Sequence, residues 1–261
     1  MALIIEVPLK FSVPDPGMRR RLELGVQGAT RILDVGCNHG YTSKLLLGLN
    51  RNKGLVTGVD RFPCKGDPVS RIPGLAFRNL DLDTIAGLEG LAYEPSDLVY
   101  CSQVIEHLEA PLEFLHAVAR GIDPGGLLFI STVCRDREAS PSPRWLYRNR
   151  YGVSTLHPGH LREYACVEDL TRGIEAAGFR ILAAALSPVA YPLIDVVLKH
   201  RWCPDILANN PVTQWLRWGL RWPIAGYFVL QVWAQYPIPD TAEPYWLREE
   251  GSQAIGMVKG K

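Results

Sequence analysis

Residues 32–40, Ile-Leu-Asp-Val-Gly-Cys-Asn-His-Gly, constrain the fold of this chain more than any other segment. An apolar strand has to end at Val35, the backbone has to turn tightly, and a helix has to begin near Tyr41. Glycine supplies the dihedral angles that such a turn needs, and it lets a ligand approach the main chain. The segment therefore predicts a strand–turn–helix unit with a ligand site at the turn, although a tight turn without a ligand would have the same pattern.

The rest of the chain alternates short apolar strands with helices. The predicted strands are 31–35, 55–59, 75–80, 97–102, 127–133 and 179–186, and the predicted helices are 41–49, 110–122 and 167–177. This alternation is typical of a parallel sheet that is covered by helices on both faces. One more strand is expected at the end of the chain, over residues 253–261. The sequence therefore predicts an α/β domain.

Composition and charge exclude several classes of protein. Of the 261 residues, 47% are hydrophobic, which is enough to bury a core and excludes global disorder. The net charge of +1 gives the chain no general attraction for nucleic acid, so we expect no nucleic-acid partner. The six cysteines form no C-x-x-C pair, which argues against a zinc ribbon and favours free thiols. Because the N-terminus has no recognisable signal peptide, we expect a cytoplasmic protein.

Residues 188–250 contain six of the seven tryptophans of the chain. We expect them to form an inserted subdomain, so that 1–187 and 251–261 make up the main domain. The uncharged stretch 222–239 is interrupted by prolines and is too short for a helix that crosses a membrane.

The inserted subdomain has two interpretations. Three tryptophans within 215–222 share one face of a predicted helix, and Arg217 and Arg221 share the opposite face. Tryptophan with arginine on an amphipathic helix suits a membrane surface, which would make 212–239 a peripheral contact at the inner membrane face or a contact to a lipid-type acceptor. The alternative is a lid, a homodimer contact or part of the core, where tryptophan is equally suited.

The glycine-rich turn has the spacing D-x-G-x-N-x-G, which differs from the dinucleotide fingerprint G-x-G-x-x-G. It resembles the first motif of class I S-adenosylmethionine-dependent methyltransferases, D/E-x-G-x-G-x-G, with Asn38 at the middle glycine. Asparagine tolerates a left-handed backbone better than most residues, so the turn can form. The resemblance implies a Rossmann-like fold: a seven-stranded, mostly parallel sheet with an antiparallel final strand and helices on both faces. It also implies S-adenosylmethionine as cofactor and S-adenosylhomocysteine as product, bound through Asp34, Gly36, Cys37, Asn38 and Gly40.

Three further positions match the same family in order along the chain. Asp60, followed by Arg61, ends the second strand and matches the acidic residue that binds the ribose hydroxyls, since a carboxylate accepts two hydrogen bonds side by side. The position that binds the adenine amino group and ring corresponds to Asp81 and Leu82, and the segment at the methionine end begins with Ser102 and Gln103.

The acceptor side offers histidines as candidate bases. Glu106 and His107 follow the fourth strand, at the edge of the sheet where open α/β proteins bind ligands. The segment from His157 to Tyr164 resembles an H-x-R-x-[FY] segment of small-molecule and sugar methyltransferases, which adds His160 and His157. Histidine titrates near neutral pH and can accept the proton of an alcohol or phenol. We therefore expect O-methylation of a small molecule, sugar or lipid, with His107, His160 and Glu106 as the catalytic candidates.

A metal-dependent alternative rests on the same residues. RNA 3′-terminal 2′-O-methyltransferases bind a divalent metal through E-x-x-E-H and a distant histidine, and Glu106, His107 and His160 would suit such a site. Here Gln103 replaces the first glutamate, and a neutral amide binds a hard cation less well. We therefore expect no metal. Metal-assisted RNA methylation stays as one alternative, and a non-catalytic cofactor-binding subunit stays as another.

Overall fold

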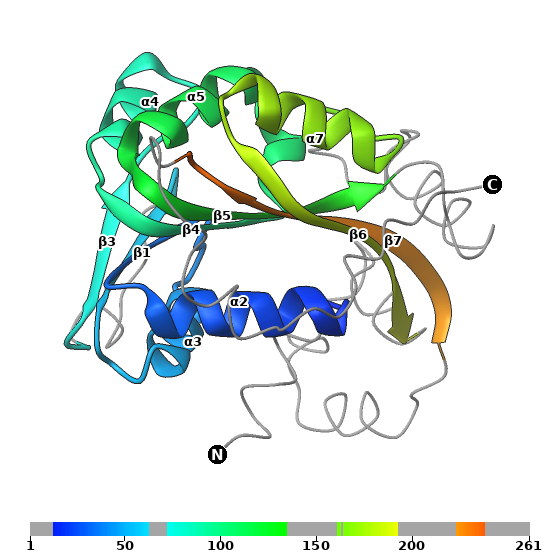
Figure 1. Ribbon diagram of the computed structural model, residues 1–261, viewed down its shortest axis with the longest axis horizontal. Helices are drawn as coiled ribbons and strands as arrows, with labels where there is room; N and C mark the ends of the chain where they lie inside the picture. Colours follow the sequence, from blue (N-terminus) through cyan, green and yellow to red (C-terminus); the bar gives the residue numbers. More distant parts are fainter. Residues whose placement is uncertain (1–12, 63–71, 135–160, 163, 193–222, 238–261) are drawn as a thin grey trace, which may run out of the picture.

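The computed structural model describes residues 13–62, 72–134, 161–162, 164–192 and 223–237, and Figure 1 shows their arrangement. The sheet is built from β1 Arg31–Val35, β2 Leu55–Asp60, β3 Leu75–Asn79, β4 Ser96–Ser102, β5 Ile122–Cys134, β6 Arg180–Pro192 and β7 Pro223–Gln235. The helices are α2 Pro16–Gly28, α3 Tyr41–Leu49, α4 Ile85–Ala92, α5 Pro111–Gly121 and α7 Val167–Ala176, and a 3₁₀ turn, η2, spans Ile105–His107.

The strands form one sheet in the order β3-β2-β1-β4-β5-β7-β6. Strands β1 to β5 pair with their neighbours in parallel, whereas β7 lies between β5 and β6 and is antiparallel to both. This confirms the predicted seven-stranded, mostly parallel sheet with an antiparallel final strand. Strand β5 begins at Ile122, earlier than the predicted strand 127–133, and its pairing with β4 has a register shift in this added part.

Helices cover both faces of the sheet, as Figure 1 shows: α2 and α3 lie on one face, and α4, α5 and α7 lie on the other. Each face buries its own apolar cluster. Helix α2 contributes Leu22 to one cluster and meets the sheet residue Trp233 there, whereas Phe114 of α5 and Leu170 of α7 belong to the other. Burying a large apolar side chain of this kind stabilises the fold by roughly 1.5–3 kcal/mol.

The position of the final strand differs from the sequence prediction. Strand β7 occupies 223–235, inside the stretch expected to form an insertion, whereas the predicted strand 253–261 lies outside the described residues. Residues 188–192 likewise continue β6. The structure thus places 188–192 and 223–235 in the main sheet, and the division into a main domain and an inserted subdomain stays a prediction. A strand with neighbours on both edges and helices on both faces needs an apolar, uncharged sequence, which is what 222–239 offers.

The location of β7 also limits the membrane interpretation. Side chains 229–235 are buried in the sheet, so this part of the predicted peripheral contact 212–239 does not face outward. Residues 193–222 and 238–250 lie outside the described residues, so the lid, dimer and membrane interpretations of these segments stay predictions. In the portion of the chain that the structure describes, no helix has the length and apolar character needed to cross a bilayer.

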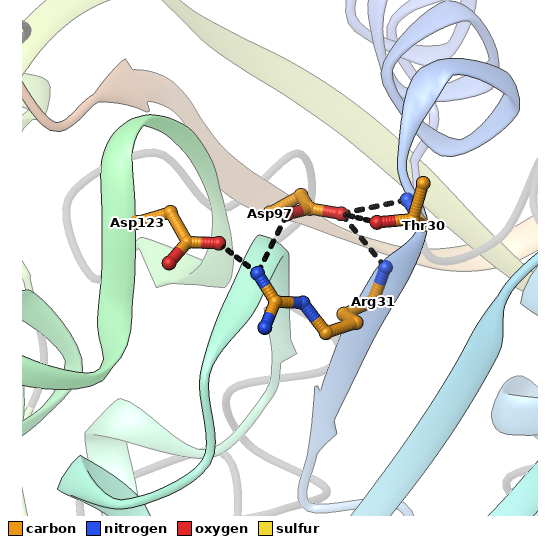
Figure 2. Close-up of polar contacts among 4 residues, drawn as sticks. All are labelled: Thr30, Arg31, Asp97 and Asp123. Carbon is orange, nitrogen blue, oxygen red and sulfur yellow. Dashed lines mark hydrogen bonds and ion pairs between the residues drawn. The ribbon is translucent and has the colours of Figure 1, made fainter.

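A polar cluster fixes the amino-terminal ends of three strands (Figure 2). Asp97 of β4 accepts hydrogen bonds from the backbone N–H groups of Thr30 and Arg31, at 2.7 and 2.8 Å, and from the Thr30 hydroxyl. The Arg31 guanidinium bridges Asp97 and Asp123 of β5. Burial on its own raises the pKa of Asp97, but the hydrogen bonds from Thr30 and Arg31 outweigh it and hold that pKa below its ordinary value. The cluster thus locks β1, β4 and β5 together at one end of the sheet.

Candidate functional site

A cavity of about 460 Å³ opens at the carboxyl ends of the parallel strands, opposite the end that carries the polar cluster. The chain leaves β1 toward β2 on one side and returns to β4 on the other side, and such a switch point is where open α/β sheets bind ligands. The lining residues follow these strands: Gly36, Asn38, Val59, Asp60, Arg61, Phe62, Leu80, Asp81, Leu82, Asp83, Gln103, Val104, His107 and Leu108.

The glycine-rich turn after β1 forms one wall of the cavity. Gly36, Asn38 and Gly40 all have left-handed φ angles, of 75°, 48° and 75°. The N–H groups of Gly36 and Cys37 donate to the Val59 carbonyl, at 2.9 and 3.2 Å, which fastens the turn to β2. A Cβ atom on Gly36 would overlap the Val104 side chain. The glycine therefore lets two loops meet closely and leaves bare backbone at the cavity surface.

Asp60 ends β2 and supplies a carboxylate to the cavity. Its Oδ2 accepts from the Asn38 N–H at 2.8 Å, and its Oδ1 accepts from the Phe62 N–H at 3.0 Å. Each oxygen keeps a second lone pair, so the carboxylate can still accept two donors from a ligand. The Arg61 guanidinium lies over the Phe62 ring, 4.9 Å from its centroid, at the same rim.

The turn after β3 adds two more carboxylates and an apolar wall. Asp81 accepts from the Asp83 N–H at 3.1 Å, and Asp83 in turn accepts from the Glu109 N–H at 2.8 Å. The second of these bonds joins this turn to the turn after β4. Leu82 is buried and, with Leu80, forms an apolar part of the cavity lining. An apolar surface beside an exposed carboxylate can hold a flat ring that carries an amino group.

The turn after β4 closes the cavity on the remaining side. Gln103 has a left-handed φ of 58°, and its N–H donates to the Ser131 carbonyl at 2.8 Å. This unusual conformation directs the chain into η2, which places His107 on the cavity wall. Val104 and Leu108 complete the wall. A strained backbone next to a cavity is a common feature of functional sites.

Glu106 occupies a different position from its neighbour His107. Its side chain is fully buried, and it does not line the cavity. Its Oε2 accepts from the Thr132 hydroxyl at 2.8 Å, whereas Oε1 has no hydrogen-bond partner among the described residues. Burial raises the pKa of Glu106 to about 7, against the lowering effect of its hydrogen bonds. Glu106 therefore lies beneath the turn and away from the cavity lining, and its catalytic role stays a prediction.

Asp34 of β1 lies behind the glycine-rich turn. It is 1% exposed and accepts from the Ser43 hydroxyl at 2.6 Å. Burial, with a smaller contribution from the negative charge of Asp60, raises the pKa of Asp34 to about 7 against the lowering effect of the Ser43 hydrogen bond. The pair links β1 to α3, so Asp34 shapes the turn from within.

The cavity contains most of the predicted cofactor residues but not all of them. Asp34 and Cys37 are buried, Gly40 precedes α3 with a left-handed φ, and Ser102 ends β4, and none of the four lines the cavity. His160 and His157 lie outside the described residues, so their roles stay predictions. Sequence reasoning missed Val59, Phe62, Leu80, Asp83, Val104 and Leu108, although each lies within three residues of a predicted site residue.

A metal site is not evident in the described part of the chain, where no group of three or more His, Cys, Asp or Glu side chains could hold a metal ion. His160 would be the third ligand of the metal-dependent alternative, and its position is not described. That alternative therefore stays a prediction.

Comparison with protein families matches residues 10–184, well over half of the chain, to the model of a methyltransferase domain. Among curated relatives, the ubiquinone biosynthesis O-methyltransferase of Xanthomonas oryzae pv. oryzae (strain PXO99A) is 36% identical over 116 residues. The match covers 43% of this chain and 46% of that protein, so the chain spans less than half the length of the relative.

Solved structures resemble this chain in fold. The arsenic(III) S-adenosylmethionine methyltransferase CrArsM of Chlamydomonas reinhardtii has a TM-score of 0.50 and 19% identity, over 84% of this chain and 67% of that chain. The [4+2]-cyclase SpnF has a TM-score of 0.53 and 18% identity, over 84% of this chain and 82% of that chain. Because one of the two is a cyclase, the fold by itself does not determine the reaction.

Proposed function

The chain belongs to the methyltransferase-domain family, and from that premise we propose that it transfers a methyl group from S-adenosylmethionine to a hydroxyl oxygen of a small molecule. The observation that carries the proposal is the cavity at the sheet switch point, where Gly36, Asp60, Asp81 and His107 share one lining. The O-methyltransferase relative supports oxygen as the methylated atom.

The cavity fits the proposed cofactor in shape and charge. Gly36 presents bare backbone, because the space of a Cβ atom is taken by Val104. Asp60 keeps free lone pairs for the two ribose hydroxyls, and Asp81 with Leu82 suits the adenine amino group and ring. Carboxylates outnumber the cations in this lining, which favours a ligand with a sulfonium charge.

His107 is the base in this proposal. When bound, S-adenosylmethionine would supply a methyl group whose bond to the positively charged sulfur breaks with the electron pair staying on sulfur, which leaves S-adenosylhomocysteine. The neutral imidazole of His107 takes the proton of the acceptor hydroxyl, and the oxygen lone pair becomes available for the new C–O bond. The apolar residues Val104 and Leu108, which line the cavity with His107, limit the water around the imidazole.

Cofactor binding is tested first, by calorimetry with S-adenosylhomocysteine. We expect Asp60→Ala to weaken binding about 100-fold, because two hydrogen bonds to a charged acceptor contribute about 1.5 kcal/mol or more each. Glu113→Ala, an exposed carboxylate of α5, is the matched control and should leave the affinity unchanged. Absence of binding by the natural chain would refute the proposal.

Turnover is tested with a panel of phenols, sugars and lipid quinols, measured as release of S-adenosylhomocysteine and by mass spectrometry of the product. His107→Ala should lower kcat by about 100-fold or more, the usual contribution of a positioned base. His116→Ala, an exposed histidine of α5, should retain full activity. A methyl group found on nitrogen or carbon would overturn the assignment of oxygen, and full turnover by His107→Ala would overturn the assignment of the base.

A further inference from the structure

The turn that carries His107 is fastened by a short segment from much later in the chain. Residues 161–162 lie against η2, and the N–H groups of Leu161 and Arg162 both donate to the Glu106 carbonyl, at 2.9 and 3.3 Å. A carbonyl oxygen has two lone pairs, so this one is fully used. The backbone immediately before His107 is therefore held by two bonds from outside the turn.

The backbone after His107 is held by the same segment through a side chain. The Arg162 guanidinium reaches across the turn, and its Nη2 donates to the Glu109 carbonyl at 2.9 Å. The N–H of Glu109 is engaged as well, by the carboxylate of Asp83 at 2.8 Å. Arg162 therefore clamps the backbone on both sides of His107. The Arg162 N–H bonds to the Glu106 carbonyl, and the Arg162 guanidinium bonds to the Glu109 carbonyl.

Two titratable groups near this clamp, Glu106 and Tyr164, do not line the cavity. Glu106 is buried beneath the turn and bonded to Thr132. Tyr164 is half-buried and does not line the cavity, and burial raises the pKa of its phenol to about 12, so it stays protonated at neutral pH. Of the titratable groups beside the clamp, Asp83 and His107 line the cavity, and Asp83 already accepts from the Glu109 N–H at 2.8 Å.

From these contacts we infer that Arg162 is a positioning residue, which sets the place of the His107 imidazole relative to the acceptor hydroxyl. The inference rests on the proposed function, because it takes His107 as the base. The guanidinium is planar and presents its donors in a fixed fork, so it holds a carbonyl at a defined distance. A displacement of a reacting group by about 1 Å is enough to slow a reaction about 100-fold. Loss of the side-chain clamp should therefore affect the rate more than the binding of either ligand.

Arg162→Ala, Arg162→Lys and the control Arg172→Ala, an exposed arginine of α7, form the test set. We expect Arg162→Ala to lower kcat by about 10- to 100-fold. The KM for the acceptor, the affinity for S-adenosylhomocysteine and the melting temperature should stay close to those of the natural chain. Arg162→Lys keeps one charged donor for the carbonyl and should recover most of the lost rate, and Arg172→Ala should change nothing.

A readout without turnover comes from the imidazole itself. The His107 ring signal in proton NMR is identified by its absence in His107→Ala. Its chemical shift should move in Arg162→Ala, while the signals of the distant His39 and His116 stay in place. An unmoved His107 signal, or unchanged kcat in Arg162→Ala, would overturn the inference. A fall in kcat that is matched by equal losses of cofactor affinity and melting temperature in both the alanine and the lysine variants would overturn it too.

The two proposals can fail separately. If His107→Ala keeps full turnover, the proposed base is wrong, whatever Arg162→Ala does. If His107→Ala is inactive while Arg162→Ala is fully active, the base stands and the positioning role of Arg162 is wrong.

Discussion

Replacement of Gly36 by alanine tests whether the close approach of two loops shapes the cavity. The structure indicates two separate free-energy costs of this substitution. Gly36 has a φ of 75°, and a left-handed backbone costs about 1–2 kcal/mol for a residue with a Cβ atom. The new Cβ would also lie well inside 3.0 Å of the Val104 Cγ2 atom, and overpacking of this kind costs about 1–3 kcal/mol. We therefore expect Gly36→Ala to lower the free energy of unfolding by about 2–5 kcal/mol.

A double-mutant cycle separates the two penalties. In Gly36→Ala with Val104→Ala, the overlap is removed but the left-handed backbone remains, so about 1–3 kcal/mol should return. Gly48→Ala is the matched control, because Gly48 lies in α3 and a Cβ there meets nothing within 4 Å. In a helix alanine is favoured over glycine by roughly 0.5–1 kcal/mol, so this variant should be slightly more stable than the natural chain.

The assay is urea unfolding followed by circular dichroism, with calorimetric titration of S-adenosylhomocysteine on each folded variant. Because Val104 and Gly36 both line the cavity, Gly36→Ala should also weaken the binding of this ligand. If Gly36→Ala unfolds at the same urea concentration as the natural chain, or if Val104→Ala brings no recovery, the reasoning from loop contact is wrong.

Three further variants test the framework around the site. Asp97→Ala leaves three hydrogen-bond donors of residues 30 and 31 without their acceptor. It should lower the free energy of unfolding in urea by about 2–4 kcal/mol and leave the affinity for S-adenosylhomocysteine unchanged. Weaker binding would contradict the conclusion that the polar cluster and the cavity are independent. Burial raises the pKa of Asp34 to about 7, against about 3.9 when unfolded, so the folded chain keeps a proton that the unfolded chain releases. Stability should therefore fall as pH rises from about 4 to 7, and Asp34→Asn should flatten this profile in thermal unfolding; an unchanged slope would refute the assignment. Asn50 is fully buried and binds two carbonyls and one N–H, so Asn50→Ala should cost about 2–4 kcal/mol in urea unfolding, and a cost below 1 kcal/mol would show that water replaces these bonds.

Local patterns in the sequence were sufficient for the strands and turns that build the cavity. Asp60 and Asp81 were found because each lies at the end of a predicted strand, and the carboxyl ends of parallel strands meet at one edge of a sheet. Helices α2 and α4 were missed, although both had signals. Asp15 caps α2 ahead of a proline in its first turn, and the Thr84 hydroxyl accepts from the Gly87 N–H at the start of α4.

Two features of the chain depend on tertiary structure and could not be predicted from local sequence patterns. The place of β7 depends on which segment pairs with β5, and that choice is decided by partners about 100 residues apart, such as Leu127 and Gln235. The separation of Glu106 from His107 depends on the 3₁₀ turn, in which successive side chains point about 120° apart. Adjacent residues in the sequence therefore face the core and the cavity respectively.

The insertion of β7 between β5 and β6 has a consequence for synthesis of the protein. Strands β5 and β6 leave the ribosome first but have no direct pairing with each other, and the strand that joins them ends only at Gln235. Until that residue emerges, the apolar edge of β5 has no partner, and an unpaired edge of this kind invites association with other chains. The incomplete chain is thus exposed to aggregation until β7 has been translated, however early the cavity residues are in place.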